Sequence, residues 1–118
     1  MWRLGNSPRK QAKTALAVVG ALLEDGEMVE TAVIGRLESN PAVLVLTDRG
    51  LLLADDRQWK PVAERFTLDG SFQVQGWQDE KTASLTLLTG ARQFAVERIA
   101  DRPLAVDMAQ RIRARCGG

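Results

Sequence analysis

The sequence has no histidine and no tyrosine, and its one cysteine, Cys116, lies close to the C-terminus. Without histidine, the side chain that exchanges protons most readily near neutral pH is missing. Ser–His and Cys–His nucleophile pairs and His-ligated metal sites are therefore excluded. One cysteine cannot form an intrachain disulfide, so nothing indicates secretion. We expect the Cys116 thiol, so near the end of the chain, to be mobile.

The sequence also lacks an excess of charge of either sign. Sixteen Lys and Arg residues face fifteen Asp and Glu residues, which leaves a formal net charge of +1. Such a balance gives no global attraction to nucleic acid or to a membrane, so we expect no nucleic-acid partner. A chain of 118 residues suits one domain, residues 1–118, around a single hydrophobic core.

A hydrophobic run long enough to span a bilayer is missing as well. Residues 15–23 (ALAVVGALL) follow three cations, which resembles the start of a signal peptide. The acids Glu24, Asp25 and Glu27 come next, where a small-residue cleavage site would be required, and a span needs about twenty apolar residues. The run therefore indicates a helix with one buried face, and we expect a cytoplasmic protein.

Helical patterns are present at both ends. Ser7 and Pro8 favour a helix start, Gly26 favours its end, and the sequence predicts a helix over 8–24. Asp101 and Pro103 open a second helix, predicted over 102–115. Its expected buried stripe consists of Leu104, Ala105, Met108, Ala109 and Ile112.

Between the helices, over residues 28–98, the hydrophobic period is two. Short alternating segments separated by turn signals predict seven strands in an antiparallel sandwich or partly open barrel. Residues 43–46 and 51–53 are apolar on both faces, so their hairpin needs cover on its outer side too. We expect the helix over 8–24 to supply that cover.

Several local motifs resemble those of the bacterial pleckstrin-homology-like domains. Glu24-Asp25-Gly26-Glu27 resembles the acidic "GE" segment before the first strand of that family, residues 45–52 (VLTDRGLL) resemble its second hairpin, and residues 59–62 (WKPV) are similar to its approach to the fourth strand. The similarity covers residues 24–115. It implies a mainly β, α+β fold: a partly open antiparallel seven-stranded barrel capped by the C-terminal helix, here with an added N-terminal helix.

The same resemblance argues against phosphoinositide binding. Relatives that bind these lipids carry several Lys and Arg residues in the loop after the first strand. The corresponding residues here, 35–41, hold one cation, Arg36, and one acid, Glu38. A phosphate pocket needs several converging donors, so we expect none at this loop.

Three clustered carboxylates, Asp48, Asp55 and Asp56, have two interpretations. They could bind a divalent cation, but they lack the spacing of a calcium loop. They also fall at turns, where Asp commonly accepts hydrogen bonds from its own backbone. The second interpretation is favoured, and we expect no metal and no cofactor.

Candidate contact residues cluster near the N-terminus: Trp2, Arg3, Arg9, Lys10 and Lys13, with no acid among the first 23 residues. Cations in a first helical turn oppose the helix dipole, so they favour attraction to an anionic surface with Trp2 as an interfacial anchor. The alternative is pairing with the acids of 24–30, or a solvated basic patch.

Two further tryptophans, Trp59 and Trp77, are candidates of another kind. Trp77 falls on the same strand face as Gln73 and Gln75, which alternation marks as exposed. An exposed Trp often marks a binding surface, although packing under a loop would explain it equally well. We expect a non-enzymatic domain that binds a protein partner or itself; the alternative is peripheral binding to anionic membrane through the N-terminal helix.

Overall fold

A computed structural model describes residues 13–56 and 62–117 of the chain. Seven strands lie between two helices, as the sequence predicts. The elements are α2 (Lys13–Leu22), β1 (Val29–Leu37), β2 (Asn40–Thr47), β3 (Gly50–Asp55), β4 (Ala63–Phe66), β5 (Phe72–Gln78), β6 (Ala83–Thr89), β7 (Arg92–Ile99) and α3 (Arg102–Arg115).

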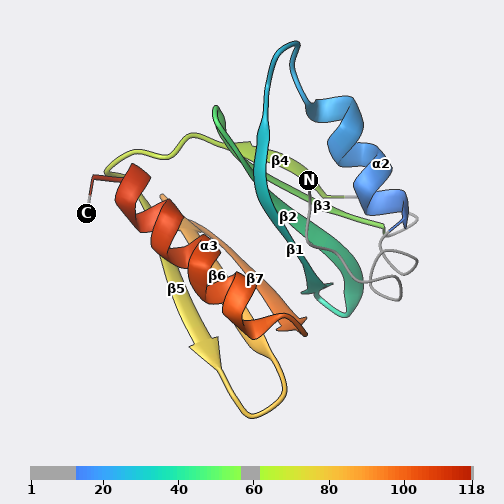
Figure 1. Cartoon of the computed structure of the whole chain (residues 1–118), viewed down its shortest axis with the longest axis vertical. Coiled ribbons are helices and arrows are strands. Elements are labelled where there is room, and N and C mark those ends of the chain that lie inside the picture. Colours follow the sequence, from blue (N-terminus) through green and yellow to red (C-terminus); the bar gives the residue numbers. More distant parts are fainter. Residues whose placement is uncertain (1–12, 57–61, 118) are drawn as a thin grey trace.

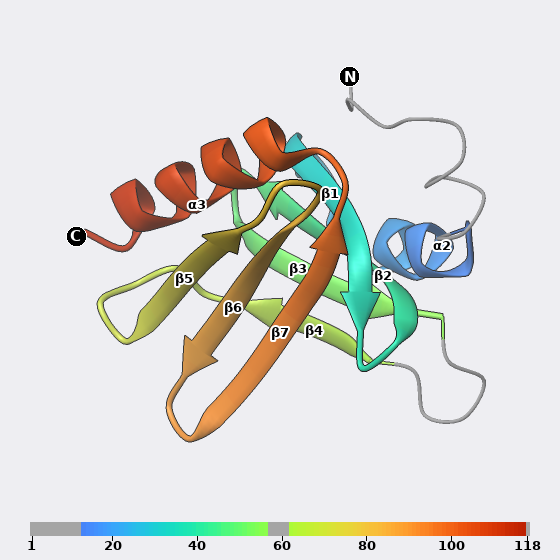
Figure 2. The same ribbon diagram turned by 90° about the horizontal axis from the view of Figure 1, so that it is seen from below.

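All seven strands form one antiparallel sheet in the order β4-β3-β2-β1-β7-β6-β5. The sheet bends into two halves, which meet where β1 pairs with β7 at Arg36–Glu97 and Leu37–Val96 (Figure 2). A Cβ on Gly35 would lie 2.4 Å from the carbonyl oxygen of Glu97, so glycine permits this close approach. Within residues 13–56 and 62–117 the barrel does not close, and β4 and β5 are its two edge strands.

Helix α3 lies across the concave side of the sheet, over its β5–β7 half (Figure 1). Asp101 caps its start by accepting a hydrogen bond from the Leu104 N–H at 3.1 Å. The predicted stripe is confirmed, since Leu104, Ala105, Met108, Ala109 and Ile112 are all buried in the main core. The helix therefore closes the open end of the barrel.

Helix α2 lies on the opposite, convex side of the sheet, against β2 and β3 (Figure 2). Its Val19 side chain is fully buried in a second cluster with Ala32, Val43, Val45 and Leu52. The expected cover of the doubly apolar hairpin is thus confirmed, because the side chains of β2 and β3 are buried on both faces from Ala42 onward. The predicted start of this helix at residue 8 lies outside the described residues.

One expectation from the sequence is wrong, and β1 is less regular than simple alternation would make it. Cys116 is not a mobile thiol: it is half-buried against the main core, and its N–H donates to the Ile112 carbonyl at 3.0 Å. Val29 does not share a face with Val33, because the register of β1 and β2 shifts between Val29 and Thr31. This irregularity turns Val29 towards the cluster under α2.

Candidate functional site

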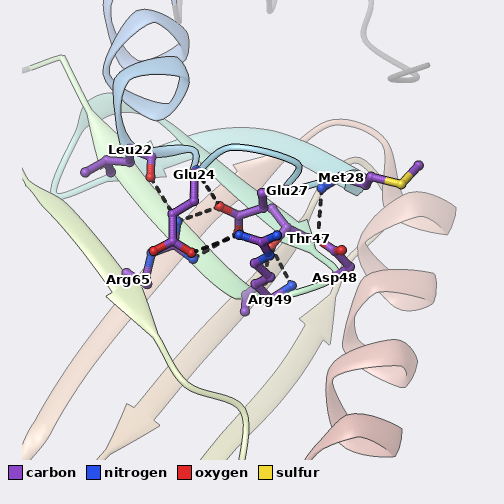
Figure 3. Close-up of polar contacts among 9 residues, drawn as sticks. Leu22, Glu24, Glu27, Met28, Thr47, Asp48, Arg49 and Arg65 are labelled. Atoms are coloured by element: carbon purple, nitrogen blue, oxygen red, sulfur yellow. Dashed lines mark hydrogen bonds and ion pairs between the residues drawn. The ribbon is translucent and has the colours of Figure 1, made fainter.

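The acidic segment before β1 is built into the fold through Glu27, whose side chain is fully buried (Figure 3). Arg65 on β4 donates to both oxygens of this carboxylate, at 2.9 and 2.7 Å, and to the Leu22 carbonyl at 2.9 Å. Thr47 donates through its hydroxyl, and the Glu24 N–H donates at 2.9 Å. One carboxylate thus joins the end of α2 to β2 and β4.

These contacts shift the pKa values of both Glu27 and Arg65. The hydrogen bonds from Arg65 lower the pKa of Glu27 from 4.5 to about 2, against the opposing effect of burial. The same contact raises the pKa of Arg65. A carboxylate satisfied by four donors is charged at neutral pH and has little capacity left for a ligand, so we assign this cluster a structural role.

The expectation that the clustered aspartates hydrogen-bond their own turns is wrong for Asp48. Asp48 accepts from the Met28 N–H at 2.8 Å, and buried Asp55 accepts from the Val62 N–H at 2.8 Å. The Asp48 carboxylate therefore ties two segments that are 20 residues apart, whereas Asp55 bonds to a residue seven positions further along the chain. Within the described residues, no group of three or more Asp, Glu or Cys side chains is arranged to hold a metal ion.

The edge strand β5 presents a different kind of surface. Phe72 and Val74 point into the core, whereas Gln73, Gln75 and Trp77 point outward and are exposed. Trp77 is 63% exposed, which confirms the face predicted from alternation and argues against its packing under the following loop. Within the described ranges, β5 pairs with β6 on one side and with no strand on the other.

The backbone groups on the free side of β5 follow from its register. The Asp79 N–H donates to the Thr82 carbonyl at 2.9 Å, and hydrogen-bonded pairs alternate in an antiparallel ladder. The N–H and C=O groups of Val74, Gly76 and Gln78 therefore point away from β6. Arg113 of α3 agrees with this geometry, because its Nη2 lies 3.5 Å from the outward carbonyl of Val74.

Two hollows lie beside β5, between the sheet and α3, and the first of them also extends over β6. The first, here the Leu85 hollow, has a volume of about 360 Å³ and a floor of small and apolar residues, including Gly76, Ala83, Leu85, Ala105 and Ala109. The second, the Ile112 hollow, has a volume of about 340 Å³ and is lined by residues that include Phe72, Val74, Ile112 and Cys116. We call the two hollows together the β5 groove.

The overall arrangement is similar to that of a known structure. A pleckstrin homology domain from Shewanella amazonensis SB2B, known from its crystal structure, superposes with a TM-score of 0.55 and 20% sequence identity. The match covers 92% of this chain and 99% of that chain. The chain has a pleckstrin-homology-like fold. No protein-family model and no curated protein matches the sequence, so the likeness shows the fold, and function is argued from the residues.

In this pleckstrin-homology-like fold, the connection between β1 and β2 is a tight turn. Glu38 and Ser39 both have positive φ, 51° and 72°, as the two central residues of a type I′ hairpin turn do. Arg36 donates to the Ser39 carbonyl at 3.0 Å, and the Asn40 amide donates to the Glu38 carbonyl at 3.1 Å. This turn offers one guanidinium, already engaged, and no cluster of converging donors for a phosphate.

Most of the candidate contact residues near the N-terminus lie outside the described residues. Trp2, Arg3, Arg9 and Lys10 lie outside the described residues, as does Trp59, and of Lys13 only its place at the start of α2 is described. Among the described residues, no helix is long and apolar enough to cross a membrane. Trp77, the one predicted contact residue whose side chain the structure describes, is among the residues that line the Leu85 hollow.

Sequence reasoning singled out Trp77 but did not name the residues that line the groove beside it. The signal that the sequence holds is the run of small residues, Gly76, Ala83, Ala105 and Ala109, which leaves room between a strand and a helix. These small residues indicate a groove only once β5 is known to be an edge strand, because a neighbouring strand would occupy the space beside a central strand.

Proposed function

We propose that the protein is a non-catalytic binding module that accepts an extended segment of a partner protein along the free edge of β5, beside α3. The observation that carries this proposal is the row of outward N–H and C=O groups on Val74, Gly76 and Gln78. An added strand can satisfy these groups through main-chain hydrogen bonds, whatever the sequence of the partner.

The surroundings of the edge support the same function. Strand addition gains specificity when pockets accept alternate side chains of the incoming strand. The Leu85 and Ile112 hollows lie along the face of β5 that an incoming strand would share with α3. Trp77 borders the Leu85 hollow, but its exposed side chain points from the other face of β5 and would cover the outward side chains of the added strand.

The other edge strand, β4, is less suited to accept a partner. It is four residues long, Ala63–Phe66, and two of these residues are charged. Arg65 is held by Glu27, and Glu64 forms an ion pair with Arg92. Short strands with charged side chains are how natural sheets discourage pairing at an edge. We therefore assign partner binding to β5.

A pair of substitutions at Gly76 tests the proposal. Gly76→Pro removes an N–H that faces away from β6, so the β5–β6 ladder is preserved while the free edge loses a donor. Gly76→Ala is the matched control, because its Cβ would lie 3.7 Å from Leu85 Cδ2, an ordinary contact. Affinity capture from the native cell should recover a partner with the wild type and Gly76→Ala, but not with Gly76→Pro. Equal capture by all three proteins would contradict the proposal.

Two alternatives, self-association at β5 and binding to anionic membrane, can be distinguished from this proposal by experiment. If the partner is a second copy of this chain, light scattering of the purified protein should give a mass that rises with concentration and that Gly76→Pro returns to the monomer. The membrane alternative depends on Arg9 and Lys13. It requires salt-sensitive co-sedimentation with anionic vesicles that the combined Arg9→Glu and Lys13→Glu change abolishes.

A further inference from the structure

One cation lies at the middle of the β5 groove. Arg113 lines both the Leu85 hollow and the Ile112 hollow, and of the described residues that line either hollow it alone is charged. Its guanidinium is near the Val74 carbonyl, at 3.5 Å, which is the limit of a hydrogen bond. No carboxylate in the described part of the chain forms an ion pair with it.

The neighbouring cations on α3, Arg111 and Arg115, each lie near a carboxylate. Arg111 is held by Asp107, with Nε 2.8 Å from Oδ2. Arg115 reaches the Thr47 carbonyl and lies 3.9 Å from Glu30. Among the described residues, Arg113 is therefore the cation of this helix segment that has no acidic partner, and it is the one that lines the groove.

The geometry of a paired strand fixes which partner side chains would meet these features. Residues opposite Phe72, Val74 and Gly76 are two apart in the incoming strand, so their side chains lie on one face. That face is the one turned towards α3, because Phe72 and Val74 point into the core on this side. The three side chains would meet the Ile112 hollow, Arg113 and the Leu85 hollow in that order.

We propose that the β5 groove selects an extended segment with an acidic residue flanked, two positions away on each side, by apolar residues. This inference rests on the proposed function, strand addition at β5. The carboxylate would accept hydrogen bonds from the Arg113 guanidinium, and charge-assisted bonds of this kind are about twice as strong as neutral ones. Because Gly76 has no side chain, the apolar residue opposite it can be large.

The probes are three synthetic peptides that differ at one central position. Each is a threonine-rich strand of about nine residues with a leucine two positions before and after the centre, and the centre is aspartate, threonine or lysine. Binding is followed by amide chemical shifts of the ¹⁵N-labelled full chain, which also report whether the peptide lies on β5. The aspartate peptide should bind about tenfold more tightly than the threonine peptide, and the lysine peptide most weakly.

Two charge reversals on α3 complete the test. Arg113→Glu should invert the order, so that the lysine peptide binds best, and Arg111→Glu is the matched control that should leave the order unchanged. Equal binding of the three peptides at β5 would overturn the acidic preference and leave strand addition standing. If no peptide shifts the β5 amides, the acidic preference is overturned too, and the capture experiment with Gly76→Pro decides separately whether strand addition also fails.

Discussion

Glu27 shows how much of this fold depends on a single ionised side chain. Its carboxylate accepts hydrogen bonds from Arg65, Thr47 and Glu24, which lie on three different segments. The "GE" segment, which resembles that of the bacterial pleckstrin-homology-like domains, therefore has a physical purpose here. It fixes the end of α2 against the β1–β4 half of the sheet.

Glu27→Gln should lower the free energy of unfolding at neutral pH by about 2 kcal/mol, because it leaves the Arg65 guanidinium without its counter-charge. The folded-state pKa of Glu27, about 2, lies below its ordinary value of 4.5. Its ionisation therefore stabilises the fold above pH 4.5, and this contribution is lost as the pH falls towards 2. Urea denaturation at several pH values measures both effects.

The matched control is Glu24→Gln. The Glu24 side chain is 59% exposed and lies 3.5 Å from Arg49, so its replacement should change stability by less than about 1 kcal/mol. The difference in stability between wild type and Glu27→Gln should shrink as the medium is acidified. A difference that stays constant down to the lowest pH would show that the Glu27 charge does not stabilise the fold.

At the scale of elements, α2 is part of the domain. Its residues cover the outer face of β2 and β3, and Val19 is fully buried between the helix and Val43, Val45 and Leu52. Without this cover, a row of apolar side chains on the convex face would meet water. Exposed apolar patches of this kind cause aggregation.

Val19→Asp should therefore destabilise the protein by about 3 kcal/mol or more, because it buries an unpaired charge. Ala21→Asp, on the exposed side of the same helix, is the control for helix propensity and should have a small effect. Thermal unfolding and binding of a hydrophobic dye measure the two outcomes. If both variants unfold at the wild-type temperature, α2 is a detachable arm.

The helices and strands could largely be predicted from the sequence, but the contacts between side chains far apart in the chain could not. The stripe of α3 and the doubly apolar hairpin follow from local periodicity, which each segment carries by itself. The pairing of Glu27 with Arg65, 38 residues away, depends on the folded sheet. Asp48 was misread for the same reason: its acceptor role towards the Met28 N–H is not local.

At the scale of the whole molecule, the proposed strand addition depends on the sheet being open. A closed barrel has no free edge, whereas this sheet ends in β4 on one side and β5 on the other. β4 is short and its charges are engaged, and β5 borders the groove against α3. The sequence predicted a partly open barrel, but strand order, and hence the identity of the edges, arises from long-range pairing.

Residue-resolved hydrogen exchange on β5 tests the central claim, that its free edge is the binding edge, most directly. In the free protein, the amides of Gln75 and Trp77, which face β6, should be protected, and those of Gly76 and Gln78 should exchange rapidly. Adding the partner captured by the wild type should slow exchange at Gly76 and Gln78. Exchange at these two amides that stays fast in the complex would show that the partner binds elsewhere.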